Sequence, residues 1–156
     1  MSHPVDGYNG VTVEQTIAPQ TISGNGDYTE GADVDKGMYN AVLHVLEVGE
    51  SGDTWGSTLY TDCILQDSAD GTTYAAVTDA ADYIGTMVTA ASGIFAVLDA
   101  EAEDNAVHWI GYRGTKQYSR IYLDRTGNHA TGTPMSAIAI KSNARFTSLS
   151  GLLPTG

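Results

Sequence analysis

AVHWIGYRGTKQYSRIYLD, residues 106–124, is the strongest local structural signal in the chain. It predicts two β-strands, Val107–Tyr112 and Gln117–Leu123, joined by a short turn that contains Gly114. Along the second strand, tyrosine and arginine alternate with serine, isoleucine and leucine, so the two faces differ in polarity. A period of two is what a half-buried antiparallel strand requires, and glycine provides the backbone freedom of a tight turn. We therefore expect a β-hairpin that buries one of its faces.

Extended segments on both sides of this hairpin predict a protein made of strands. Residues 38–48, MYNAVLHVLEV, carry apolar residues on both faces, which indicates a central strand covered on each side. Residues 125–133 read as a polar loop, and residues 78–84 fit either one helical turn or a bulged sheet edge. The other expected strands are Val11–Ile17, Ser57–Gln66, Tyr74–Val77, Gly93–Asp99 and Pro134–Lys141. About eight strands without a clear helix predict an all-β fold, an antiparallel β-sandwich or jelly roll.

Residues 1–36 are expected to form an extended N-terminal arm, and residues 37–156 the β-sandwich domain. The first segment contains few large apolar side chains, so it buries little surface of its own. We expect this arm to become ordered against a partner; a loose terminus is the alternative. On the first interpretation, deletion of residues 1–24 leaves the fold intact and abolishes partner binding. The residues expected to contact the partner are Val11, Val13, Ile17, Pro19 and Ile22.

The composition bounds the class of protein. The chain has 156 residues, 42% of them hydrophobic, which fits one folded domain with a hydrophobic core. Cys63 is the only cysteine, so an intrachain disulfide is excluded. No apolar run approaches the roughly 20 residues that span a bilayer, and the N-terminus lacks the pattern of a signal peptide. We therefore expect a protein that is made and folded in a reducing cytoplasm.

Acidic residues dominate the chain and are unevenly distributed. The net charge is −12, which argues against nucleic acid and anionic membrane as partners, because phosphate binding needs clustered Lys and Arg. Residues 1–112 contain 18 acids and one base, whereas residues 113–156 contain one acid and six bases. This asymmetry is either an ordinary solvated surface or an acidic surface and a basic edge that meet between copies. The candidate oligomer contacts are Arg113, Lys116, Arg120, Leu152 and Leu153.

Motifs for catalysis are absent from the sequence. It lacks the nucleophile elbow, the helical zinc-protease motif, the P-loop and the glycine motif of dinucleotide binding. The four histidines are dispersed, and Cys63 fits a small buried apolar residue. We expect no catalytic residue, cofactor site or metal site, with Ca²⁺ as a weak alternative. Two acidic turns motivate that alternative, DVDKG at 33–37 and DSADG at 67–71, although Asp-Gly is also a common turn signal.

Aromatic side chains offer a second binding chemistry. The aromatic residues expected to be exposed are Trp55, Trp109, Tyr112, Tyr118 and Tyr122. Together they would make a platform on which sugars stack, although cross-strand pairing within the sheet is the commoner explanation. A carbohydrate-binding or receptor-binding β-module therefore stays among the alternatives.

The order of the segments resembles a known family. TIAPQTIS at 16–23 is followed by GADVDKGMYNAVLHVLEVG at 31–49, LQDSADGTTYAAV at 65–77 and HWIGYRGTKQYSRIYL at 108–123, and then by a last strand that begins with Thr-Pro. This pattern resembles small virion structural proteins of tailed bacteriophages, of the capsid decoration or cement type. Such proteins are β-sandwiches that sit as oligomers on the outer surface of the phage head and stabilise contacts between capsomers.

The resemblance implies a function without catalysis. It implies the major capsid protein as partner, a homo-oligomer (dimer or trimer) and a location on the outer capsid surface of the virion. It implies no contact with nucleic acid or membrane. Alternatives that fit the same composition are a tail or head–tail joining component of the virion, and the carbohydrate-binding module described above.

Overall fold

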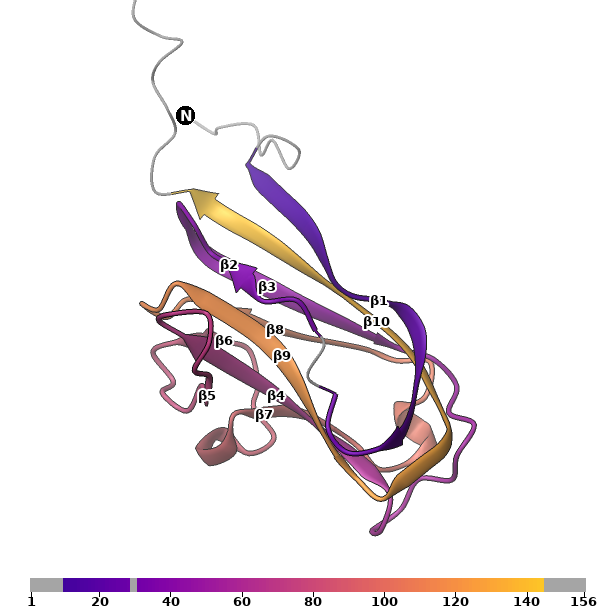
Figure 1. Ribbon diagram of the computed structural model, residues 1–156. Coiled ribbons are helices and arrows are strands. Elements are labelled where there is room, and N and C mark those ends of the chain that lie inside the picture. The colour runs from indigo at the N-terminus through magenta and orange to yellow at the C-terminus, as the bar shows by residue number, and fades with distance from the viewer. Residues whose placement is uncertain (1–9, 29–30, 145–156) are drawn as a thin grey trace, which may run out of the picture.

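The computed structural model describes residues 10–28 and 31–144, which build two antiparallel sheets packed face to face (Figure 1). The strands of sheet A are β1 (Val11–Asn25), β3 (Tyr39–Val48), β6 (Tyr83–Ile84), β8 (Val107–Tyr112) and β10 (Asn128–Ala144). The strands of sheet B are β2 (Val34–Asp35), β4 (Tyr60–Ser68), β5 (Ala75–Ala76), β7 (Ile94–Leu98) and β9 (Tyr118–Thr126). Sheet A has the order β1-β10-β3-β8-β6; sheet B has the order β2-β9-β4-β5, with β7 also paired to β4. The expected all-β sandwich is confirmed, and the jelly roll stays a prediction.

Alternation along the strands separates one shared core from two outer faces. β3 buries every second residue from Val42 to Val48, and β9 buries every second residue from Ser119 to Leu123. The predicted sidedness of both strands is confirmed, because successive side chains of a strand point to opposite faces of the sheet. Side chains from both sheets meet in the core, among them Leu46, Leu65 and Leu98, which are fully buried.

Strand β10 corrects one expectation. It has 17 residues and begins at Asn128, so most of the predicted loop at 125–133 is strand. Gly127, with φ 88°, makes the turn between β9 and β10, in a conformation that favours glycine. A Cβ there would lie 2.4 Å from the Thr58 carbonyl oxygen, which leaves no room for a side chain. The loop prediction was wrong because the segment is polar and its pairing partner, β1, is far away in sequence.

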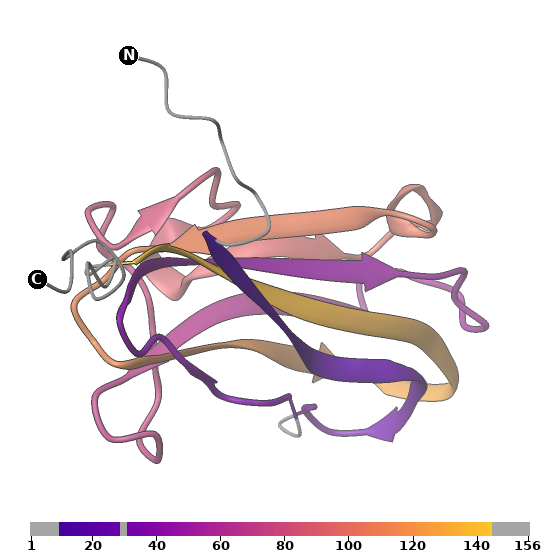
Figure 2. The same ribbon diagram turned by 90° about the horizontal axis from the view of Figure 1, so that it is seen from above.

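Strand β1 belongs to the sandwich and is not a separate arm. It pairs antiparallel with β10 along one edge of sheet A (Figure 2). Ile17 and Ile22 are 1% and 4% exposed and belong to the core. In the described part of the chain, the boundary between residues 36 and 37 therefore separates no arm from the sandwich. Deletion of residues 1–24 removes an edge strand with two core side chains, so we now expect the truncated chain to lose stability.

Short elements complete the fold. Residues 78–84, for which the sequence fits either a helical turn or a sheet edge, end in the two-residue edge strand β6. Two 3₁₀-helices of three residues, η1 (Ala90–Ser92) and η2 (Glu101–Glu103), flank β7. None of the helices in the described ranges is long and apolar enough to cross a membrane.

Candidate functional site

No segment among the described residues covers the outward face of sheet A. β3 is a central strand of this sheet, between β10 and β8, as the sequence predicts. Its inner residues are buried against sheet B, but Leu43 and Val45 on its outer side remain partly exposed. The expectation that this strand is covered on both sides was therefore wrong. Sheet B covers one side, and none of the described segments covers the other (Figure 1).

Cross-strand neighbours join the outer apolar residues of sheet A into one patch. Two adjacent rows cross the sheet: the first contains Val13, Ile140 and Leu43, and the second contains Ile138, Val45 and Trp109. Opposed residues in an antiparallel pair have Cβ atoms about 5 Å apart, so the members of each row touch. Val107 follows on the same face of β8, and Ile84 covers Gly111, where a Cβ would lie 3.1 Å from the Ile84 Cβ.

We call this surface the apolar face. Its members are Val13, Leu43, Val45, Ile84, Val107, Trp109, Ile138 and Ile140. Trp109 is 64% exposed, Val13 56% and Ile138 37%. Scattered exposed apolar residues are normal on a protein, but a contiguous patch across five strands is the kind of surface at which proteins bind partners.

Charge is nearly absent from the apolar face. Of the 26 charged residues in the chain, only Glu47 stands at an outward position in the described rows of β1, β10, β3 and β8, and its carboxylate accepts a hydrogen bond from the Ser136 hydroxyl at 2.9 Å. Strand spacing of about 4.8 Å and a two-residue repeat of about 6.7 Å give the eight positions of the face an area of about 260 Å². That is about a third of what one partner buries in a standard interface, about 800 Å². The face therefore has the composition of an interface core, and a polar rim would have to supply most of the buried area.

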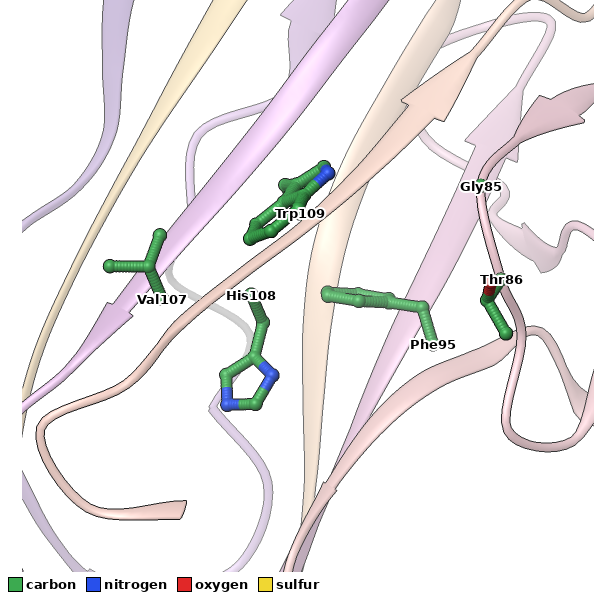
Figure 3. A pocket seen from close by; sticks show the side chains of 6 residues that line it. All are labelled: Gly85, Thr86, Phe95, Val107, His108 and Trp109. Carbon is green, nitrogen blue, oxygen red and sulfur yellow. The ribbon is translucent and has the colours of Figure 1, made fainter.

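A hollow adjoins the apolar face at β8. It has a volume of about 340 Å³ and is lined by Gly85, Thr86, Phe95, Val107, His108 and Trp109 (Figure 3). His108 and Trp109 leave β8 on opposite sides, so Trp109 belongs to the outer face and His108 turns toward the space between the sheets. His108 Nε2 lies 3.5 Å from a Glu103 carboxylate oxygen without hydrogen-bond geometry.

The outward face of sheet B has the opposite character. Asp62 of β4 lies directly opposite Asp124 of β9, an arrangement of like charges that destabilises a sheet. Burial and the nearby Asp99 carboxylate raise the pKa of Asp62, and burial and the nearby Asp27 carboxylate raise the pKa of Asp124. The outward face of sheet B therefore carries charged groups, these two carboxylates and Arg120, where that of sheet A is apolar.

The basic residues of the predicted basic edge contact other groups of the same chain. Lys116 forms an ion pair with Asp67 at 2.7 Å. Arg113 Nε donates to the Ala81 carbonyl oxygen at 2.8 Å, and the Arg120 guanidinium lies 3.8 Å from the centroid of the Tyr74 ring. These three bases therefore contact groups from the first part of the chain, although the 18 acids there far outnumber them. Leu152 and Leu153 lie outside the described residues.

The residues expected to contact a partner from the N-terminal segment are divided between core and surface. Ile17 and Ile22 are buried in the chain's own core, so they are not available to a partner. Val11 is partly exposed at the start of β1, Val13 lies on the apolar face, and Pro19 is exposed beside a hollow of about 250 Å³ at the other end of sheet A. Val11, Val13 and Pro19 therefore remain candidates for contact.

The expected aromatic platform does not assemble. Trp55 is 8% exposed and its indole Nε1 donates to Asp104 at 2.8 Å. Tyr112 is fully buried, and its hydroxyl donates to Asp67 at 3.1 Å. The expectation of exposure was wrong for both, because each side chain fills the core and hydrogen-bonds its polar tip. Tyr118 and Tyr122 are partly exposed on sheet B, and Trp109 alone of the five is strongly exposed.

In each of the two acidic turns, an aspartate side chain accepts hydrogen bonds from backbone N–H groups of the same turn. Asp70 Oδ1 accepts the N–H groups of Thr72 and Thr73 at 2.9 and 2.8 Å, and these bonds hold the pKa of Asp70 below its usual range. Asp35 accepts the N–H of Gly37 at 2.8 Å. Among the residues that the structure describes, no group of three or more His, Cys, Asp or Glu is arranged to hold a metal ion. Cys63 is fully buried, as expected, and burial raises the pKa of its thiol.

Most residues of the apolar face were missed by sequence reasoning. Leu43, Val45, Ile138 and Ile140 were assigned to strands, but not to a binding site. The available signal was that both faces of residues 38–48 are apolar. That pattern shows that both sides need a cover, but not whether the cover comes from the same chain.

Comparison with known proteins supplies no family assignment. No protein-family model matches the chain, and no curated protein matches it.

Proposed function

We propose that this chain is a non-enzymatic virion structural protein, a capsid decoration protein that binds the outer surface of a phage head through its apolar face. The observation that carries the proposal is the apolar face itself, a contiguous and nearly uncharged surface with Trp109 as its most exposed side chain. Interface cores are depleted in charge and enriched in aromatic anchors. The phage context comes from the sequence resemblance, and the apolar face supports the requirement for a protein partner.

The two outer faces suggest the orientation of the bound protein. Docking through sheet A would cover the apolar face and leave the charged outer face of sheet B in solvent. Each copy that binds only the assembled shell adds its binding free energy to the stability of that shell. Copies that bridge adjacent capsomers add more, because the second contact is intramolecular.

The test uses two variants with matched exposure. Trp109 and Met38 are both 64% exposed, but Met38 lies outside the apolar face. Heads that lack the protein are incubated with purified chain, and the bound fraction is measured by cosedimentation. We expect Trp109→Ala to weaken binding at least tenfold and Met38→Ala to leave it unchanged, with both variants unfolding at the wild-type temperature. Equal binding by Trp109→Ala and wild type would contradict docking through this face.

Sedimentation of the free chain tests whether the face binds a second copy instead. A dimer that Trp109→Ala dissociates, together with unchanged head binding, would assign the apolar face to the homo-oligomer. A monomer that binds heads would assign the face to the capsid.

A carbohydrate-binding module is the second candidate, favoured by the exposed Trp109 beside the hollow of about 340 Å³. Aromatic rings stack on sugars in such sites, so a glycan array is the discriminating experiment. Glycan binding that Trp109→Ala abolishes, without binding to heads, would favour this candidate over the capsid.

A further inference from the structure

We infer that the open edge of β8 is a second binding site, which accepts an extended segment of a partner protein as an added strand. This site is the backbone edge of β8 and the space beneath it, and the inference does not depend on the capsid assignment. Three observations carry it: the direction of the backbone groups, the hollows below the edge, and the charge at one end.

One edge of β8 is only partly paired. On its inner edge, β8 pairs with β3 from Val107 to Tyr112. On its outer edge, β6 reaches only Gly111 and Tyr112. Among the described residues, no strand pairs with the outer edge between Val107 and Trp109.

The direction of the free backbone groups follows from their neighbours. The Ala106 carbonyl accepts the Val48 N–H at 2.9 Å, toward β3, and the Arg113 N–H donates to the Asp82 carbonyl at 2.8 Å, toward β6. Backbone groups of successive residues point alternately to the two edges of a strand. Residues 107 and 109 therefore share the direction of residue 113 and present two N–H and two C=O groups to the open edge. Such an edge is a template for the addition of a strand.

Space for side chains of the added strand lies beneath this edge. The hollow of about 340 Å³ and a second one of about 410 Å³ share Phe95 and His108 as walls, so they adjoin each other beside β8 and β7, and we call the two together the groove. Figure 3 shows the residues that line the first hollow. Phe95 is 7% exposed and forms part of the core. Inward side chains of an added strand would fill this groove, and outward side chains would extend the apolar face beside Trp109. An added segment therefore needs apolar residues at alternate positions.

Acidic groups at one end of the groove favour an added strand that carries a positive charge at that end. Asp99 and Glu103 line the second hollow, and Asp62 is close enough to Asp99 for its pKa to be raised by it. Among the residues that the structure describes, His108 is the only side chain lining either hollow that can carry a positive charge. A lysine or arginine at the end of the added strand would complement these carboxylates.

The test uses the full chain and the synthetic peptide Lys-Thr-Val-Thr-Leu-Thr-Val-Lys, with the same peptide N-methylated at alternate residues as control. Amide hydrogen exchange measured by NMR reports pairing at individual residues. We expect the unmodified peptide to slow exchange of the Val107 and Trp109 amides at least tenfold, and the N-methylated peptide to have no effect. Absence of binding, or binding that leaves both amides unprotected, would overturn the inference.

A matched pair of variants tests the backbone donor directly. Val107→Pro removes the N–H that faces the open edge, whereas Val107→Ala removes the side chain and keeps the N–H. Proline is tolerated at an edge position whose N–H faces solvent, and circular dichroism checks the fold. We expect Val107→Pro to bind the peptide at least tenfold more weakly than Val107→Ala. Equal affinities would contradict strand addition; should Val107→Pro not fold, the N-methylated peptide decides the question.

Discussion

The two tryptophans of the chain show how position decides the role of a residue. Trp55 is 8% exposed, donates to Asp104, and packs edge-on against His129 with ring centroids 5.8 Å apart. Trp109 is 64% exposed on the apolar face. The sequence predicted the same exposed platform for both, because residue type alone does not report the burial of a loop side chain. The difference arises from the fold, which packs Trp55 into the core and leaves Trp109 on the outer face of sheet A.

His44 makes the stability of the fold dependent on pH. It is fully buried, its Nε2 lies 2.9 Å from the Ser119 hydroxyl, and burial lowers its pKa to about 4. In the unfolded chain the imidazole takes up a proton near its ordinary pKa of about 6.5, whereas the folded chain resists protonation until pH 4. Stability is therefore fully present above pH 6.5 and is lost as the pH falls toward 4.

We expect the free energy of unfolding to fall by about 2 kcal/mol between pH 7.5 and 5 from His44 alone. Burial and Arg125 also lower the pKa of His129, which adds a loss of the same sign. The double variant His44→Leu with Ser119→Ala removes both hydrogen-bonding partners and keeps the site filled. Urea titrations at the two pH values measure the effect. If the double variant lost as much stability as wild type, His44 would not be the source.

At the scale of elements, the sequence predicted which face of a strand is buried, because this follows from a period of two. It did not predict which strands pair, because the partners are distant in sequence. The alternation of Tyr118 to Leu123 was sufficient to assign both faces of β9, because the face follows from local geometry. Residues 11–25 were assigned to an arm because they contain few apolar residues. Two of these, Ile17 and Ile22, reach the core once β10 supplies the backbone hydrogen bonds of the strand. The sequence of β1 alone determines neither its pairing register nor its partner strand.

Strand β1 offers a matched test of its two faces. Ile17 is 1% exposed toward the core, and Val13 is 56% exposed on the apolar face. We expect Ile17→Ala to lower the free energy of unfolding by about 2–5 kcal/mol, because it leaves a cavity in the core. Val13→Ala should change stability by less than about 0.5 kcal/mol and weaken docking. Urea unfolding followed by fluorescence measures the first effect. Similar stability losses in the two variants would contradict the assignment of faces.

The whole molecule is a sandwich with two unlike outer faces. Sheet A presents the apolar face, with Glu47 as the one charge in its described rows, and sheet B presents the opposed carboxylates of Asp62 and Asp124. The sequence predicted the acidic excess, but not its location, because bases from the last part of the chain pair with acids from the first. Lys141 and Glu14, 2.9 Å apart, are a further example. Sequence reasoning missed the apolar face for a related reason. A strand with apolar residues on both sides has the same sequence pattern whether its second side packs against another sheet or against another protein.

The most direct test of this account is a cryo-electron microscopy map of phage heads decorated with the purified chain. We predict density on the outer shell in which sheet A faces the capsid and sheet B faces solvent, and no such density with Trp109→Ala. A map in which the outer face of sheet B contacts the shell, while the apolar face stays in solvent, would contradict the central claim.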